Sequence, residues 1–392
     1  MNNRRQEKRP AWLGWMGDMA TITEFLLAKP WKSPWAVPKT INSIVRAIGI
    51  VGFANNPLTG VLILAGIFVG NVDVGCACLL AGVIAIIFSK ALNQPEQLIS
   101  DGVVVFNTIL VGCISVAVFP GIFGRPIDSI FWIYLVVALI ITTYVDKGLG
   151  ALMAPSSLPP LSIPFNIAAA LLLLTLHSVV GQSGSDSLEN VTSPTNLTSH
   201  TNSTEKIDWL KVMEGTLLAA GQIYGVGTID SSILIYLGFL VYSPLLTVFF
   251  FMGSVIGTVT GALVSTAPYT NVYLGLWGYN AMLTAGGISY FLVPTPGVVL
   301  ASVVGATMAA GVQVATMHIF RVVTVKVLSY PFNVAMLIIL AISTTKNPPF
   351  TWVAEKTFPE HHVFLHIFSH RKQQTDGVSS QEPEELLQIN HK

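Results

Sequence analysis

Apolar residues fill most of the chain between positions 41 and 345, in runs separated by short polar or Gly/Pro-containing breaks. The first half predicts helical segments over roughly 41–54, 58–70, 74–92, 99–119, 130–145 and 164–180, with a break over 146–160. The second half predicts segments over roughly 213–224, 232–242, 244–266, 272–293, 297–325 and 331–344. A full membrane span needs about 20 apolar residues, so several of these segments are short enough to be half helices or re-entrant helices.

A six-residue motif occurs once in each half. Leu161–Asn166 reads LSIPFN, and Leu328–Asn333 reads LSYPFN. Two weaker pairs have nearly the same separation along the chain: Phe106–Leu110 with Tyr279–Leu283, and Gly49–Gly52 with Gly221–Tyr224. Three anchors in one order, at nearly one offset, indicate an internal duplication.

Each copy of the motif places a proline at the start of an apolar run. Proline lacks an N–H and its ring clashes with the carbonyl four residues back, so Pro164 and Pro331 are expected to free the carbonyls of Pro160 and Val327. A freed carbonyl in lipid is costly, so it has to face protein or a watery cavity. An ordinary proline-initiated helix with a serine N-cap would explain a single copy. Two copies at matching places favour a shared central pathway.

Composition makes the chain a polytopic protein embedded in membrane lipid, because 52% of its residues are hydrophobic and only 10% are charged, against about 25% charged in soluble proteins. The net charge is zero, which gives no reason to expect a nucleic-acid partner. Residues 1–40 carry seven Lys/Arg, three Asp/Glu and four Trp. This predicts a cytoplasmic segment at the membrane interface, without a cleavable signal peptide. The polar tail 346–392 is also expected in the cytoplasm.

Residues 181–208 form a polar linker between a first repeat over 41–180 and a second over 209–345. The linker holds three N-x-Ser/Thr sequons, at Asn190, Asn196 and Asn202, which predicts a glycosylated extracellular loop. With a cytoplasmic N-terminus, the first half must then cross the membrane an odd number of times. We therefore expect an all-α protein of two inverted repeats, each with five spans and one re-entrant helix, ten spans in all.

Charged residues are few in the apolar halves and are expected at segment ends, whereas ion-coupled transporters usually keep some in mid-span. Asp230 is the nearest candidate, and a helix cap is its simpler interpretation. Cys76, Cys78 and Cys113 are expected to be buried thiols, because no His or Cys cluster accompanies them. No nucleophile–base pair, paired carboxylates or phosphate loop supports an enzyme. We expect no metal and no cofactor.

An uncharged pathway predicts a neutral cargo. Freed carbonyls accept hydrogen bonds, and the apolar side chains near the repeated motifs would line a flat slot: Phe53, Phe106, Leu110, Tyr279 and Leu283. Such a slot suits a small planar amide, whereas an ion would lose its water without replacement. The residues alone leave urea, ammonia, water and a small amide open.

Five stretches spread over both halves resemble the facilitative urea transporter family of vertebrates. They are Phe53–Gly60 (FANNPLTG), Leu158–Asn166 (LPPLSIPFN), Gly221–Gly225 (GQIYG), Leu274–Asn280 (LGLWGYN) and Thr344–Asn347 (TTKN). The resemblance implies passive, channel-like movement of urea across the plasma membrane. It also implies a homotrimer in which each protomer has its own pore between its two halves.

The resemblance further implies a filter in this pore. Ile50 and Gln222 stand where the family has a polar residue near each end, and Ser162 and Ser329 stand where it usually has threonine in the middle. Aromatic and leucine side chains form the slots, which here are Phe53, Leu110 and Leu283, with Phe106 and Tyr279 beside them.

Three departures from the family pattern predict altered selectivity on a retained fold. Ile50 is apolar, residues 104–109 read VVFNTI instead of YGYNAT, and VGTID after Gly225 replaces a DNPW pattern. Three other functions stay open: a channel for another neutral solute, an ion-coupled transporter, and a non-transporting receptor or scaffold. Relative urea and water permeabilities, and dependence of uptake on an ion gradient, separate them.

Overall fold

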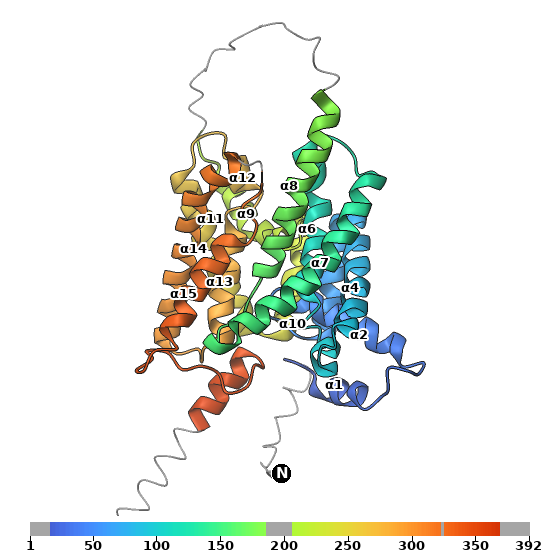
Figure 1. Ribbon diagram of the computed structural model, residues 1–392. Helices are drawn as coiled ribbons and strands as arrows, with labels where there is room; N and C mark the ends of the chain where they lie inside the picture. Colours follow the sequence, from blue (N-terminus) through green and yellow to red (C-terminus); the bar gives the residue numbers. More distant parts are fainter. Residues whose placement is uncertain (1–15, 186–205, 323–324, 369–392) are drawn as a thin grey trace, which may run out of the picture.

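The computed structural model describes residues 16–185, 206–322 and 325–368, which are helical with turns and one isolated β-bridge (Figure 1). Six of the described helices are long and apolar enough to cross a membrane. They are α4 (Val72–Ala91), α6 (Phe106–Phe123), α7 (Ser129–Met153), α8 (Ile163–Ser185), α11 (Pro244–Val264) and α14 (Pro296–Val322). The chain is therefore an all-helical, multi-pass membrane protein. Asn190, Asn196 and Asn202 lie outside the described residues.

The remaining helices are shorter, so the predicted ten spans stay a prediction. Three of them are apolar: α3 (Pro57–Gly70), α10 (Ile229–Tyr242) and α15 (Tyr330–Ile342). The others are α1 (Ala20–Leu27), α2 (Ala36–Ile50), α5 (Glu96–Ser100), α9 (Trp209–Gln222), α12 (Thr270–Tyr273) and α13 (Gly278–Phe291). An unlabelled helix covers residues 359–368.

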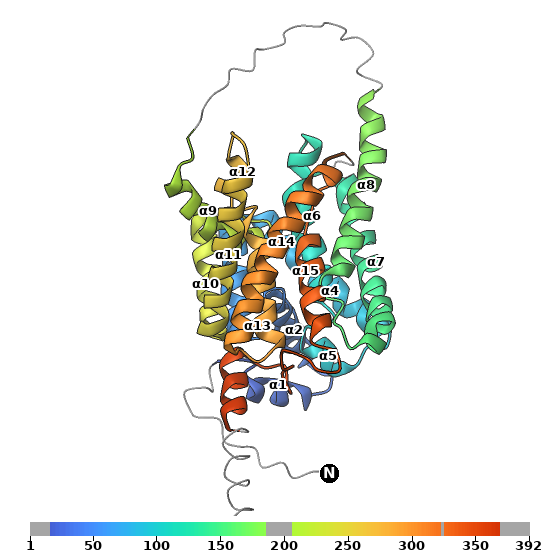
Figure 2. The same ribbon diagram turned by 90° about the vertical axis from the view of Figure 1, so that its left-hand side faces the viewer.

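Helices of the two halves start at matching places. The starts of α10, α11 and α13 follow those of α3, α4 and α6 at one identical offset, and α14 and α15 follow α7 and α8 at a second, slightly shorter one. Unusual backbone angles match as well, with φ of 78° at Gly102 and 76° at Gly275. α8 ends at the top of the molecule, whereas α15 ends at the bottom, on the side where α1 and the helix 359–368 lie (Figures 1 and 2). These observations support the predicted inverted duplication.

The two halves meet where α3 packs against α10. Thr59 Oγ1 donates a hydrogen bond to the Gly238 carbonyl over 2.8 Å. A Cβ atom on Gly66 would lie 2.9 Å from the Ser231 carbonyl oxygen, so only glycine allows this approach. Small residues and short polar bonds of this kind hold membrane helices together.

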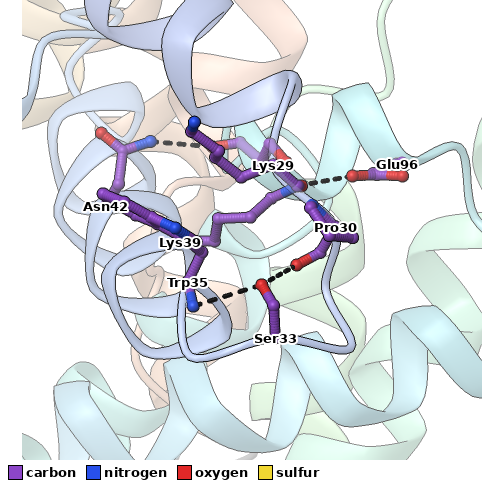
Figure 3. Close-up of polar contacts among 8 residues, drawn as sticks. Lys29, Pro30, Ser33, Trp35, Lys39, Asn42 and Glu96 are labelled. Carbon is purple, nitrogen blue, oxygen red and sulfur yellow. Dashed lines mark hydrogen bonds and ion pairs between the residues drawn. The ribbon is translucent and has the colours of Figure 1, made fainter.

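The N-terminal segment is tied to the lower side of the helices. Lys39 in α2 is buried, and its Nζ donates to the Lys29 carbonyl over 2.8 Å and to Glu96 over 2.5 Å (Figure 3). The Trp31 ring lies under two ammonium groups, with Lys39 Nζ 4.7 Å and Lys90 Nζ 3.3 Å from its centroid. This segment is therefore a folded part of the molecule.

The structure corrects the expected places of some charges. α7 continues to Met153, because nothing stops it before Pro155, so the predicted break at 146–160 starts too early. Arg46 lies inside α2, is buried, and donates to the carbonyls of Asp18 and Asn55. It fixes the fold at a position expected to be a segment end.

Two smaller expectations also need correction. Asp230 lies in the first turn of α10, whereas the N-cap is Thr228, whose side chain accepts from the Ser231 N–H. Cys78 and Cys113 are buried as predicted, but Cys76 is exposed, because it faces outward from α4.

Candidate functional site

One cavity of about 970 Å³ is lined by residues of both halves. All nine residues that the sequence suggests for a filter line it: Ile50, Phe53, Phe106, Leu110, Ser162, Gln222, Tyr279, Leu283 and Ser329. The two members of each matching pair therefore face one common space.

The centre of the cavity is built where α8 and α15 begin. Each helix follows a leucine in the left-handed region, Leu161 with φ 51° and Leu328 with φ 52°, which residues with a Cβ rarely adopt. This turn leads the chain into each helix just after a serine. The two hydroxyl oxygens, Ser162 Oγ and Ser329 Oγ, lie 2.6 Å apart. The serines are only 5% and 6% exposed, and this small area faces the cavity.

Two asparagines orient this serine pair from the opposite halves. Asn166 Nδ2 donates to Ser329 Oγ over 2.8 Å, and Asn333 Nδ2 donates to Ser162 Oγ over 3.0 Å. Two hydroxyls offer two protons and four lone pairs. The bond between the serines uses one of each, and the asparagines use two more lone pairs. Asn333 Oδ1 also lies 3.3 Å from Ser162 Oγ and can accept the Ser162 proton. When Ser162 donates to Ser329 instead, the Ser329 O–H and one lone pair of Ser162 remain for a solute.

The carbonyls of Pro160 and Val327 are not free, contrary to expectation. The Pro160 carbonyl accepts from the Ile163 N–H over 3.1 Å, and the Val327 carbonyl accepts from the Tyr330 N–H over 3.3 Å. Each proline removes one helical bond, and a tighter turn supplies another. A carbonyl oxygen has two lone pairs, so both residues, which line the cavity, keep one acceptor site.

The neighbouring carbonyls are held by a second pair of asparagines. Asn107 Nδ2 donates to the Leu161 carbonyl over 3.2 Å, and Asn280 Nδ2 donates to the Leu328 carbonyl over 3.1 Å. The Leu328 carbonyl also accepts from the Tyr279 hydroxyl over 2.5 Å. Phe106 occupies the position in the first half that matches Tyr279, and it has no hydroxyl. The Leu161 carbonyl therefore keeps one lone pair free, whereas both lone pairs of the Leu328 carbonyl are occupied.

A carboxylate lies behind one of these asparagines. Asn107 Nδ2 also donates to Asp146 Oδ1 over 2.7 Å, whereas Asn280 Nδ2 donates to Gln313 Oε1 over 3.0 Å. Asp146 is 9% exposed and lines the cavity from within α7. The expectation that Asp146 stands at the end of a segment was therefore wrong, because α7 continues past it to Met153.

Aromatic rings, tilted relative to one another, form one wall of the cavity: Phe53, Tyr290, Phe291 and Phe332. Phe53 has φ 59°, and the centroid of its ring lies 5.4, 5.9 and 6.0 Å from those of Tyr290, Phe291 and Phe332. This wall offers no charge.

The ends of α2 and α9 differ in chemistry. Gln222, the last residue of α9, donates from Nε2 to the Leu274 carbonyl over 2.8 Å. Ile50, the last residue of α2, lines the cavity with an apolar side chain. The two matching positions thus differ in polarity.

Sequence reasoning missed the asparagines that orient the serines and the leucine carbonyls. Asn166 and Asn333 are the last residues of the two copies of the motif. Their place four residues after each serine is the signal that could have predicted them as its hydrogen-bond partners. The partners of Asn107 and Asn280 were harder to find, because Asp146 and Gln313 differ in type and stand at a different offset from the asparagines.

Comparisons with known proteins agree with this architecture. The chain is 26% identical over 378 residues to urea transporter 1 of Ovis aries, covering 94% of this chain and 93% of that protein. It is 29% identical over 341 residues to urea transporter 1 of Mus musculus, covering 85% of this chain and 83% of that protein. The urea transporter family model matches residues 41–344, which include the serine pair and all residues that line the cavity except Lys356. The chain belongs to the urea transporter family.

Proposed function

We propose that this protein moves urea passively across the plasma membrane through the cavity between its halves. The observation that carries the proposal is the serine pair, which has one donor and one acceptor left when Ser162 donates to Ser329. Urea offers a carbonyl to the remaining O–H and an N–H to the remaining lone pair. The Leu161 carbonyl accepts a second N–H. A neutral planar solute therefore exchanges its water for protein hydrogen bonds at the serine pair.

The walls favour such a solute over an ion. A flat neutral molecule passes beside the Phe53 ring and between Leu110 and Leu283. The only free-energy cost of this passage is the loss of the few water molecules bound to the solute. A small ion needs several oxygens to replace its water, and the serine pair has too few. Among the described residues Asp146 is the one carboxylate that lines the cavity, and its Oδ1 accepts from Asn107 Nδ2. We give it this structural role and include no coupling ion in the proposal.

We also propose the arrangement in the membrane. The matched helix starts and the opposite ends of α8 and α15 support two inverted repeats over 41–180 and 209–345, with ten spans. α1 and the helix 359–368 lie on one side, which supports two cytoplasmic termini. The linker is then extracellular and glycosylated at one or more of Asn190, Asn196 and Asn202. Each protomer of a homotrimer holds its own pore.

A channel for another neutral solute, such as ammonia or water, is the second candidate. The apolar Ile50 favours it, because one end of the filter lacks the amide that Gln222 supplies at the other. Stopped-flow measurements on liposomes holding the full chain separate the two. We expect fast urea uptake and little added water or ammonia permeability. Water or ammonia flux without urea flux would overturn the urea proposal.

A further inference from the structure

The segment after α15 returns across the lower side of the molecule as a strap, which we define as residues 350–362. Its first part pairs with the end of α13, since the Val293 N–H donates to the Thr351 carbonyl over 2.9 Å and the Val353 N–H donates to the Phe291 carbonyl over 3.1 Å. The Trp352 indole N–H donates to the Ser343 carbonyl over 3.1 Å. The family match ends at residue 344, so the strap lies outside it.

A second anchor holds the other end of the strap. Glu360 accepts from Ser243 Oγ over 2.6 Å and from the Leu245 N–H over 2.7 Å, at the start of α11. The Tyr242 hydroxyl donates to the Thr357 carbonyl, and the Phe358 side chain is fully buried. The backbone between the two anchors is thus held in place.

Lys356 lies between these anchors and lines the cavity. Its Nζ is 5.2 Å from the centroid of the Phe291 ring, and that ring contacts Phe53 in the aromatic wall. Among the described residues Lys356 has no ion pair and no hydrogen bond. Its ammonium is an uncompensated positive charge at the mouth of the pathway.

We propose that Lys356 is a specificity-determining residue, which the strap holds at the pore mouth to repel small cations shaped like urea. The inference rests on the proposed urea pathway. Guanidinium is the informative solute, because it has the planar form and the N–H groups of urea but carries a charge. The serine pair discriminates poorly between urea and guanidinium, because the two have similar shapes and N–H groups. A fixed positive charge at the mouth of the pathway, where the dielectric constant is low, discriminates well because it repels guanidinium alone.

The test compares uptake of labelled guanidinium and urea by liposomes holding the full chain, with the membrane potential clamped at zero. We expect Lys356→Glu to raise the guanidinium-to-urea permeability ratio by about tenfold at low ionic strength. Lys356→Gln should raise it less, and Lys356→Arg should keep the original ratio. High salt should shrink the difference, because it screens charges beyond about 8 Å.

The matched control is Lys346→Gln, which removes an exposed lysine near the strap that does not line the cavity. Its ratio should equal that of the unmodified protein. An unchanged ratio in Lys356→Glu, exclusion of guanidinium by every variant, or an equal effect of Lys346→Gln would overturn the inference. Absence of urea flux in the unmodified protein would instead overturn the proposed function, and the inference with it.

Discussion

At the scale of single residues, the site depends on hydrogen-bond counting. Ser162 and Ser329 supply hydroxyls, and Asn166 and Asn333 consume the lone pairs that would otherwise be filled by water. When Ser162 donates to Ser329, one donor and one acceptor remain on oxygens that these contacts hold in place. The sequence predicted the serines from the repeated motif, but not their direct contact. That contact depends on how two helix starts from opposite halves of the chain meet in space.

Loss of one serine hydroxyl should markedly lower the urea permeability. Ser162→Ala removes the bond between Ser329 Oγ and Ser162 Oγ and one acceptor of Asn333 Nδ2, at a buried place. An unsatisfied buried group costs about 1–3 kcal/mol, so we expect urea permeability to fall by about tenfold or more. Stopped-flow light scattering on liposomes measures it. Ser178→Ala on the exposed face of the same helix is the control and should have no effect.

The difference between Ile50 and Gln222, at the two ends of the proposed filter, gives a prediction about selectivity. Ile50→Gln introduces an amide where the other half has Gln222, so it should favour urea over less polar analogues such as thiourea. We expect the urea-to-thiourea permeability ratio to change by about threefold or more, as one added hydrogen bond contributes about 1 kcal/mol. If the variant leaves both permeabilities as they were, Ile50 has no role in the filter.

At the scale of elements, the apolar pattern predicted the helices well, and it failed where breaks depend on tertiary contacts. The segments 58–70 and 74–92 agree closely with α3 and α4. The end of α7 was misplaced because a buried aspartate satisfied by Asn107 looks in sequence like a polar break. The segments 99–119 and 272–293 each contain a turn before the helix, which Gly102 and Gly275 make with positive φ.

The strap is an element whose docking should depend on pH. His362 Nε2 accepts from the Thr357 N–H over 3.1 Å, which requires a neutral ring, and burial lowers the pKa of His362 from 6.5 to about 4. The released strap therefore binds a proton more readily than the docked strap. Docking is fully stabilised above pH 6.5 and loses up to about 3 kcal/mol as the pH falls towards 4.

Hydrogen exchange of the Val293 and Val353 amides, corrected for intrinsic rates, measures this docking. Protection should fall between pH 6.5 and 4, and His362→Gln should abolish that dependence. The exposed His177 provides the control, because His177→Gln should leave the dependence intact. Equal protection at pH 7 and pH 4.5 in the unmodified protein would contradict this role of His362.

At the scale of the whole molecule, the all-helical membrane fold could be predicted because it follows from apolar runs repeated along most of the chain. The matched helix starts support the predicted duplication. The cavity required tertiary structure, since its lining comes from both halves and from the strap. Lys356 shows the limit most clearly. In sequence it is one lysine in a polar tail, and only the anchors at Trp352 and Glu360 bring it to the pathway.

The central claim is that urea crosses passively through this cavity. The most direct test loads liposomes holding the full chain with the same concentration of labelled urea inside and outside, and then imposes a sodium or proton gradient. We predict fast tracer exchange and no net accumulation on either side, with exchange slowed in Ser162→Ala. Accumulation of urea driven by either gradient, or exchange unaffected by the serine change, would contradict the account.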